Sequence, residues 1–404
     1  MKEALYTRLE ELYPEMVELR RDLHRHPELS FEEVRTPRLI GEFYQKLGVK
    51  VRTEVGGRGV VAYLEGSLPG KTVALRADFD ALPIQDEKDV PYQSTVPGVM
   101  HACGHDGHTS TLLFLAKALH EQKDQLPGKV VFIHQFAEEI TPGGAKPMIE
   151  DGCLDGVDVL FGTHLWSGFP TGTIAYKAGQ LMAAADSFEI VIKGKGGHGG
   201  IPHEAIDSIV IASQLVGNLQ QIVSRFINPT RTAVLSIGSF HSGSAFNVIT
   251  ESATLTGTVR TFDIEIREKI VALMERIIKG TCEAAGADYS FSYNRGYPPV
   301  INHESETALL KRAAEKVEGV NHVVETEALM IGEDVAYYLK EVPGTFFLTG
   351  SRNEELNATY PHHHPRFDID EKAMVIAAKT LGEATLTYLE QSNKSASEIY
   401  QTKR

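Results

Sequence analysis

The order of apolar patterns along the chain changes near Ala185 and changes back after residues 296–299, and this interruption limits the folds that the chain can adopt. On both sides of it, segments with helical periodicity alternate with short apolar runs, which predicts α/β layers around a largely buried sheet. Within it, the expected order is strand, helix, strand, strand, helix, strand, the order of a ferredoxin-like unit. We therefore predict an α/β catalytic domain with a mostly central sheet and an inserted ferredoxin-like (βαββαβ) domain.

The expected elements give the boundaries of these domains. The first domain is expected to comprise residues 1–184 and 297–390, and the inserted domain residues 185–296. In the first domain, helices are predicted at 5–26, 36–47, 108–121, 306–317, 335–341 and 371–389, and strands at 60–64, 72–77, 129–135 and 345–348. In the insertion, strands are predicted at 187–193, 233–240, 253–261 and 288–293, and helices at 205–225 and 264–285. Residues 391–404 are polar and without periodicity, and are expected to be disordered.

Composition and charge exclude several classes of partner. The chain of 404 residues has a net charge of -14 and no cluster of basic residues, which argues against nucleic acid as a partner. No apolar run approaches the roughly 20 residues that a membrane span needs. The first residues do not resemble a signal peptide, and only three cysteines occur. We therefore expect a cytoplasmic protein that associates neither with membranes nor with nucleic acid.

The segment HACGHDGH at residues 101–108 holds one thiol and three imidazoles within eight residues. A thiolate and a neutral imidazole are ligands that Zn²⁺ prefers, and the flanking glycines allow the backbone to bend so that Cys103 and His105 can meet at one ion. The alternative is a histidine-rich surface turn. Because the donors are so crowded, we favour a metal site.

Two adjacent carboxylates, Glu138 and Glu139, follow an apolar strand. Adjacent side chains on an extended chain point in opposite directions, so one can bind a metal while the other faces a substrate. Metal-assisted hydrolysis needs this division between a ligand and a general base. The alternative is an ordinary solvated pair, but open α/β sheets bind ligands at the carboxyl ends of their strands.

Two further segments offer histidines. His164 follows the apolar run 157–161 and precedes the only tryptophan by two residues, although a buried core histidine is an alternative reading. Residues 362–364 are three consecutive histidines, which can resemble a purification tag. Their internal position between two prolines argues against a tag. At least one of these three is expected to bind metal.

The inserted domain contains GKGGHG at residues 194–199, which satisfies the dinucleotide-binding pattern G-x-G-x-x-G. That pattern requires a helix directly afterwards and an acidic residue about 20 positions later. Here Ile201 and Pro202 follow, and no acidic residue stands near Val216. A flexible turn that presents His198 is therefore favoured over nucleotide binding.

Taken together, these motifs resemble the M20 family of metallopeptidases and aminoacylases, and within it the amidohydrolase branch of hippurate hydrolases, N-acyl-L-amino acid amidohydrolases and plant auxin-conjugate hydrolases. The resemblance covers about residues 20–389. It is carried by LHRHPELS (23–30), RADFDALPI (76–84), HACGHDGH (101–108), AEE (137–139), GTHLW (162–166), GKGGH (194–198), FNVI (246–249), GTVR (257–260) and HHPRF (363–367).

The resemblance implies a metal-ligand set and a general base. The ligand positions of the family correspond here to Cys103, His105, Glu139, His164 and His363, which would hold one or two Zn²⁺ or Mn²⁺ ions, with Co²⁺ as a further candidate. Among the three late histidines, His363 is selected because the family's ligand stands two residues before the proline. The general base of the family corresponds to Glu138.

The resemblance also implies supporting and substrate-binding residues. Asp80 would support the ligands, His198 would stabilise the oxyanion, and Asn247 and Arg260 would bind the substrate's carboxylate or carbonyl. The inserted domain would serve as a lid and dimerisation domain in a homodimer or a larger homo-oligomer. Many relatives carry Gly-Gly-Glu-Asp-Phe where this chain has IGEDV at residues 331–335, a difference that bears on substrate preference and leaves the metal and base positions unchanged.

The expected reaction is deacylation of a small N-acyl amino acid by activated water. A carboxypeptidase or dipeptidase with the same metal centre is a second hypothesis. A protein that binds a metal or a small molecule without catalysis is a third, from a different class.

Overall fold

The protein forms two compact units in a computed structural model that describes residues 1–401, with side chains to residue 392. Unit 1 comprises residues 1–181, 301–327 and 334 onward, and unit 2 comprises residues 182–300 and 328–333. The expected boundaries at 184/185 and 296/297 lie within four residues of these. The sequence did not indicate that residues 328–333 group with unit 2.

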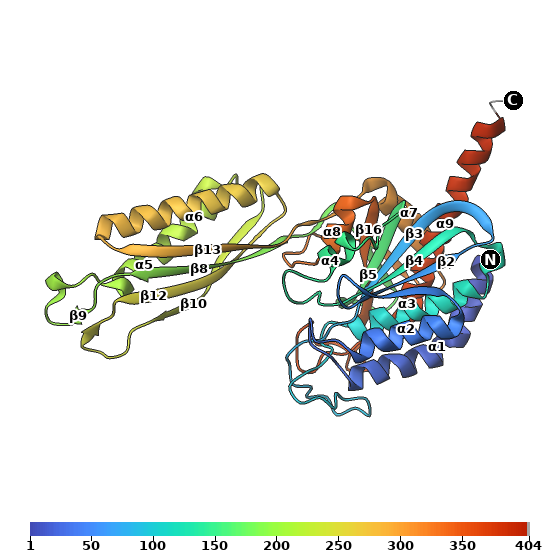
Figure 1. The fold of residues 1–404 in the computed structure, drawn as a ribbon, viewed down its shortest axis with the longest axis horizontal. Coiled ribbons are helices and arrows are strands. Elements are labelled where there is room, and N and C mark those ends of the chain that lie inside the picture. The colour runs from blue at the N-terminus through green and yellow to red at the C-terminus, as the bar shows by residue number, and fades with distance from the viewer. Residues whose placement is uncertain (402–404) are drawn as a thin grey trace. The chain divides into compact units, whose positions relative to one another are not determined.

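Unit 1 is built on an eight-stranded mixed sheet, as an α/β domain requires (Figure 1). In spatial order its strands are β1 (Lys50–Val55), β2 (Gly59–Glu65), β4 (Pro127–Gln135), β3 (Leu68–Asp78), β5 (Val159–Pro170), β16 (Gly344–Arg352), β6 (Thr173–Tyr176) and β15 (His322–Glu325). The central strands β4, β3, β5 and β16 are parallel and mostly buried, apart from the exposed start of β3 and the end of β5. Burial on both faces explains why they read as continuous apolar runs.

Helices cover this sheet. They are α1 (Lys2–Arg25), α2 (Arg35–Leu47), α3 (His105–His120), α4 (Ala145–Glu150), α7 (Glu304–Ala314), α8 (Val335–Glu341) and α9 (Lys372–Gln401). Helices α3 and α9 pack on β3 and β5, and α1 packs on both of these helices. The helix α2 starts where the carboxylate of Glu28 accepts the backbone N–H groups of residues 34–36, so this side chain satisfies three donors that the helix leaves unpaired.

Unit 2 has the expected ferredoxin-like fold. The chain runs through β8 (Ala184–Lys193), α5 (Ser208–Gln221), β10 (Ala233–Ser242), β12 (Ser252–Thr261), α6 (Ile264–Ala285) and β13 (Asp288–Tyr297). The strands form an antiparallel sheet in the order β10-β12-β8-β13, and α5 and α6 bury their apolar sides against it. The aspartates that precede α5 and α6 accept N–H groups of the first turns, as helix N-caps do.

The remaining short elements lie between the main ones. They are the strands β7 (Gly179–Met182), β9 (Gly197–His198), β11 (Val248–Ile249) and β14 (Val300–Asn302), the 3-10 turns Lys123–Gln125 and Pro202–Glu204, and a π-helical turn at Ile222–Phe226. That π-helical turn ends the helix expected at residues 205–225. Within residues 1–401, no helix is both long enough and apolar enough to span a membrane.

The end of the chain differs from the expectation of disorder. Helix α9 continues to Gln401, so residues 391–401 are helical, while the expectation for residues 402–404 lies outside the described residues. Nothing in this segment stops a helix, because it contains neither glycine nor proline.

Candidate metal centre

The sheet of unit 1 brings two acidic segments together at the carboxyl ends of its parallel strands. Strand β3 ends at Asp78 and its neighbour β4 ends at Gln135, so the residues that follow them leave the sheet side by side. The backbone N–H of Glu139 donates to Oδ2 of Asp80 at 3.0 Å. Asp80 thereby fixes the position of Glu139.

Cys103 and His105 lie at the start of α3. Gly104 between them has a φ of 92°, a left-handed conformation that glycine adopts without steric cost. The Nδ1 of His105 lies 2.9 Å from the carbonyl oxygen of Asp80 and 3.2 Å from its Oδ1. This contact orients the ring so that Nε2 lies 3.8 Å from Oε1 of Glu139. The role in supporting the ligands that the family resemblance implies for Asp80 stays a prediction.

His164 and His363 complete the group. His164 comes from β5, and its Nε2 lies 3.4 Å from Sγ of Cys103. His363 lies in the turn before α9, where its Nε2 is 3.4 Å from Oε2 of Glu139. Its φ of 65° is uncommon for a residue with a side chain, and such backbone strain of about 1–3 kcal/mol is found most often at functional sites. All five residues expected to bind metal are thus gathered in one place.

The other two late histidines face elsewhere. The ring of His362 stacks on Trp166 with centroids 4.4 Å apart, and its Nε2 lies 3.0 Å from the carbonyl oxygen of Leu165. The ring of His364 stacks on Tyr360. Of the three, His363 is the one whose imidazole lies beside Glu139.

The donors fit a divalent metal ion. Cys103, His105 and His164 each offer an atom within 4.8 Å of the others, and so do Cys103, Glu139 and His363. In addition, Nε2 of His105 and Oε1 of Glu139 are buried and have no hydrogen-bond partner. Buried polar atoms in proteins are normally paired, so two unpaired donor atoms facing each other indicate a missing ligand. Sulfur, imidazole nitrogen and carboxylate oxygen together suit Zn²⁺ and related transition metals.

The electrostatics of the site also favour a cation. Burial raises the pKa of the Cys103 thiol, and the carboxylates of Glu139 and Glu138 raise it further. Burial lowers the pKa of His105, but Asp78 and Asp80 outweigh this effect and raise it to about 10. Without a metal, the thiol and this imidazole therefore both hold their protons, and binding a cation would release them.

Replacing Cys103 by alanine should abolish or strongly reduce metal binding, because it removes the only sulfur donor of the group. Elemental analysis of the purified variant measures this directly. Cys153→Ala is the matched control, since Cys153 is also a buried free cysteine of unit 1 but belongs to none of the donor groups found among the described residues. Full metal retention in the Cys103 variant would contradict the ligand set.

Asp78 and His108 are supporting residues to which the sequence analysis gave no role. The Nδ1 of His108 lies 2.6 Å from Oδ1 of Asp78, and its Nε2 accepts the backbone N–H of Leu165 at 2.8 Å. This pair fixes the backbone beside His164. The signal was present in the sequence, because Asp78 and Asp80 alternate along an extended chain and so face the same side.

His198, Asn247 and Arg260 lie in unit 2. Strands β9 and β11 pair His198 with Val248, so His198 and Asn247 are close neighbours. The Nδ1 of His198 accepts the N–H of Gly200 at 3.0 Å, which leaves Nε2 of the exposed ring with the proton. Arg260 is half-buried on β12 and donates to the carbonyl oxygen of Val259 at 3.1 Å. The roles in catalysis and substrate binding expected for the three residues stay predictions.

Several proteins are similar to this chain over most of their length. YhaA of Bacillus subtilis (strain 168) is 55% identical over 388 residues, which are 96% of this chain and 98% of YhaA. An N-acyl-L-amino acid amidohydrolase of Geobacillus stearothermophilus is 48% identical over 303 residues, 75% of this chain and 82% of that protein. Thermostable carboxypeptidase 1 of Saccharolobus solfataricus is 41% identical over 379 residues, 93% of this chain and 96% of that protein.

A solved structure shows the same likeness. The YXEP protein of Bacillus subtilis, described as a dinuclear metal-binding peptidase of the M20 family, superposes with a TM-score of 0.81 at 37% sequence identity, and the match covers 94% of this chain and 99% of that chain. The sequence pattern of Peptidase family M20/M25/M40 matches residues 74–387. With relatives this similar over nearly their whole length, the chain belongs to peptidase family M20/M25/M40.

Proposed function

We propose that this protein is a metal-dependent amidohydrolase that removes the acyl group from small N-acyl amino acids. The observation that carries the proposal is the pair Glu138 and Glu139. Glu139 lies among the Cys103 and His363 donors, and Glu138 Oε2 lies 4.0 Å from His105 Nε2 in a group that also contains Glu139. Two adjacent carboxylates beside the same donors support a division in which Glu139 holds a metal and Glu138 handles a proton.

The proposed mechanism assigns a task to each residue. Cys103, His105, Glu139, His164 and His363 would hold one or two ions, with Zn²⁺ or Mn²⁺ as the first candidates. When bound, such an ion would supply Lewis-acid chemistry, which would make water more acidic and polarise an amide carbonyl. Glu138 takes the proton of the attacking water and then donates it to the nitrogen of the leaving amine. Asp80 keeps His105 and Glu139 in position throughout.

The proposed substrate class is inferred from the names of the relatives. One relative is named an N-acyl-L-amino acid amidohydrolase and a second, at 40% identity over 96% of this chain, an N-acetyl-L-cysteine deacetylase. The carboxypeptidase from Saccharolobus solfataricus supports a second candidate, which is cleavage of a peptide bond by the same centre. Both reactions need the same donors and the same base, so the metal centre alone does not separate them.

A hydrolysis screen separates these functions. Metal-depleted protein refilled with Zn²⁺, Mn²⁺ or Co²⁺ would be assayed with N-acetyl and N-benzoyl amino acids and with dipeptides. We expect metal-dependent release of the free amino acid from the N-acyl compounds and slower cleavage of dipeptides. Faster cleavage of dipeptides would favour the peptidase, and no hydrolysis of any amide by the metal-loaded protein would favour a binding protein without catalysis.

The remaining expectations are part of the same proposal. We propose a cytoplasmic enzyme, because the three cysteines are all free, as is usual in a reducing compartment. We also propose a homodimer or larger homo-oligomer that binds no nucleic acid. Light scattering of the purified protein measures the oligomeric state.

A further inference from the structure

Glu33 is a buried carboxylate outside the donor group that contacts the loop carrying the general base. Its side chain comes from the segment between α1 and α2 and is fully buried. Its Oε1 accepts the backbone N–H of Ala137 at 2.9 Å. Ala137 directly precedes Glu138, so this bond reaches the peptide from which the proposed base projects.

The backbone at Ala137 needs such support. Ala137 has a φ of 50°, a left-handed conformation that is unfavourable for a residue with a side chain and persists only when its surroundings hold it. The carbonyl oxygen of Ala137 accepts the N–H of Gly144 at 3.1 Å. Its N–H is held by Glu33, so both polar groups of the strained residue are fixed.

The other side of Glu138 is held by the same short segment. The N–H of Glu139 donates to Oδ2 of Asp80 at 3.0 Å, and the hydroxyl of Ser30 donates to that same oxygen at 2.7 Å. Ser30 and Glu33 are only three residues apart. One segment therefore fixes the backbone on both sides of the proposed base.

We propose that Glu33 is a positioning residue for Glu138, which acts by holding the Ala137 N–H and thereby the direction in which the base projects. This inference rests on the proposed function, in which Glu138 moves the proton. Proton transfer requires the base within hydrogen-bond reach of the water, and a displacement of about 1 Å can lower the rate by about 100-fold.

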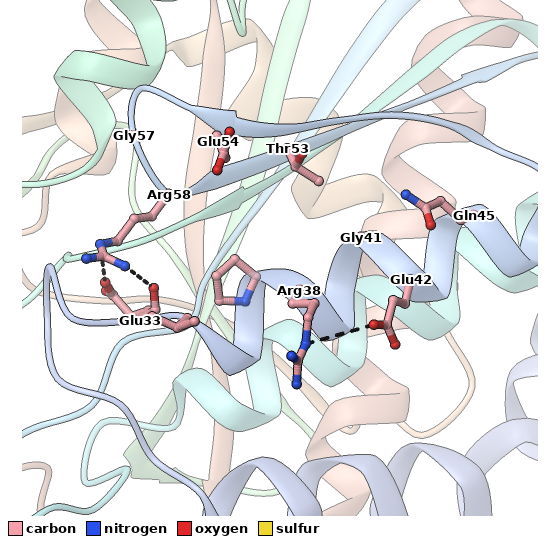
Figure 2. Close-up of a pocket in the computed structure, with 11 residues that line it drawn as sticks. Glu33, Arg38, Gly41, Glu42, Gln45, Thr53, Glu54, Gly57 and Arg58 are labelled. Carbon is pink, nitrogen blue, oxygen red and sulfur yellow. Dashed lines mark hydrogen bonds and ion pairs between the residues drawn. The ribbon is translucent and has the colours of Figure 1, made fainter.

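A pocket lies beside Glu33, whose side chain is itself fully buried. A cavity of about 420 Å³ lies beside α2 and the β1–β2 hairpin, and Glu33 lines it together with Arg38, Glu42 and Arg58 (Figure 2). The Arg58 guanidinium donates to the backbone carbonyl of Glu33, and its Nε lies 3.9 Å from Glu33 Oε2.

The protonation state of Glu33 supports a test by amide substitution. Burial raises the pKa of Glu33 to about 8, although the Ala137 N–H and Arg58 lower it in part. At neutral pH the carboxyl therefore carries a proton in most molecules. Glutamine has the same shape and a carbonyl oxygen that can accept the same N–H.

The test compares Glu33→Ala and Glu33→Gln with the wild-type enzyme on the N-acyl amino acid that it cleaves fastest. We expect Glu33→Ala to lower kcat by up to about 100-fold while KM and metal content stay near wild type. Glu33→Gln should recover most of this loss.

Glu42→Ala is the matched control. Glu42 lines the same pocket but is exposed to solvent, and its ion pair is with Arg38 at 3.9 Å. This variant should keep wild-type kcat. If Glu33→Ala does not fold, Glu33→Asp replaces it, because a side chain shorter by one carbon would not reach the Ala137 N–H and should lower kcat in the same way.

The outcomes distinguish the two proposals. Wild-type kcat in Glu33→Ala, or loss of metal from both Glu33→Ala and Glu33→Gln, would overturn the positioning role. Glu138→Gln is measured in the same assay. If Glu138→Gln is inactive and Glu33→Ala is fully active, only the positioning role fails. An active Glu138→Gln refutes Glu138 as the base, and a metal-loaded wild-type enzyme that hydrolyses no N-acyl amino acid shows that the proposed function itself is wrong.

Discussion

Replacing Glu138 by glutamine should lower kcat for an N-acyl amino acid by about 10²- to 10⁴-fold, the usual contribution of a general base, while the metal content stays near wild type. The amide has the size of the carboxylate but cannot take a proton from water. The backbone around Glu138 is held at Ala137 and Glu139, so the exchange should not move the loop. Turnover measured together with elemental analysis gives both quantities.

Glu139→Gln is the control for this experiment. Glu139 lies beside His363 and Cys103, and its replacement should reduce metal content as well as activity. Glu138→Gln would then keep its metal, whereas Glu139→Gln would lose it. Unchanged turnover in Glu138→Gln would refute its assignment as the base, and loss of metal from both variants would show that Glu138 is itself a ligand.

Replacing Arg20 by methionine should lower the free energy of unfolding of unit 1 by about 3–5 kcal/mol, the cost of leaving buried charges without their partner. Arg20 is fully buried, and its guanidinium contacts Asp106 Oδ2 and Asp368 Oδ1, both at 2.8 Å. It therefore joins α1, α3 and the segment before α9. Urea unfolding followed by the fluorescence of Trp166, the only tryptophan, measures the stability of this unit.

Arg8→Met provides the comparison on the same helix. Arg8 lies on the surface and pairs with Glu121 at 2.6 Å, an exposed ion pair of the kind that contributes about 0–1 kcal/mol. The change should therefore be small. A loss in Arg20→Met no larger than that in Arg8→Met would show that the buried network does not stabilise the fold.

The cost of the Arg20 substitution should depend on pH. Burial would raise the pKa of Asp368, but Arg20 and Lys88 outweigh it and hold this pKa below its usual range. A carboxylate with a depressed pKa contributes stability above its unfolded pKa of about 4, and this contribution is lost as the pH falls toward the folded pKa. The difference between wild type and Arg20→Met, both freed of metal by a chelator, should therefore shrink below about pH 4.

Much of the fold followed from the sequence, because its elements are long and strongly periodic. The helix α6 has the expected bounds, Ile264–Ala285, and so does α8, Val335–Glu341. The order of elements in unit 2 was sufficient to predict a ferredoxin-like fold, because that order allows few ways to pair the strands. Local patterning thus determined the architecture of both units in outline.

The strands at the edges of the large sheet were not predicted. Strands β1, β6 and β15 are four to six residues long, and β1 and β15 are only partly buried, so they carry little apolar signal. Their places depend on pairing with distant segments, as when residues 322–325 pair with residues 173–176. A local pattern cannot contain this information.

The candidate metal centre was likewise predicted only in part. The sequence by itself indicated the candidate donors, because a thiol, imidazoles and paired carboxylates crowd into short motifs whose chemistry suits a divalent metal. The resemblance of these motifs to a family selected His363 among three histidines. Only the tertiary structure decided how these donors are supported. Glu33 lies 104 positions from Ala137, and Arg20 lies 348 positions from Asp368. Such contacts depend on how the sheet and its helices pack, and no periodicity within either segment records them.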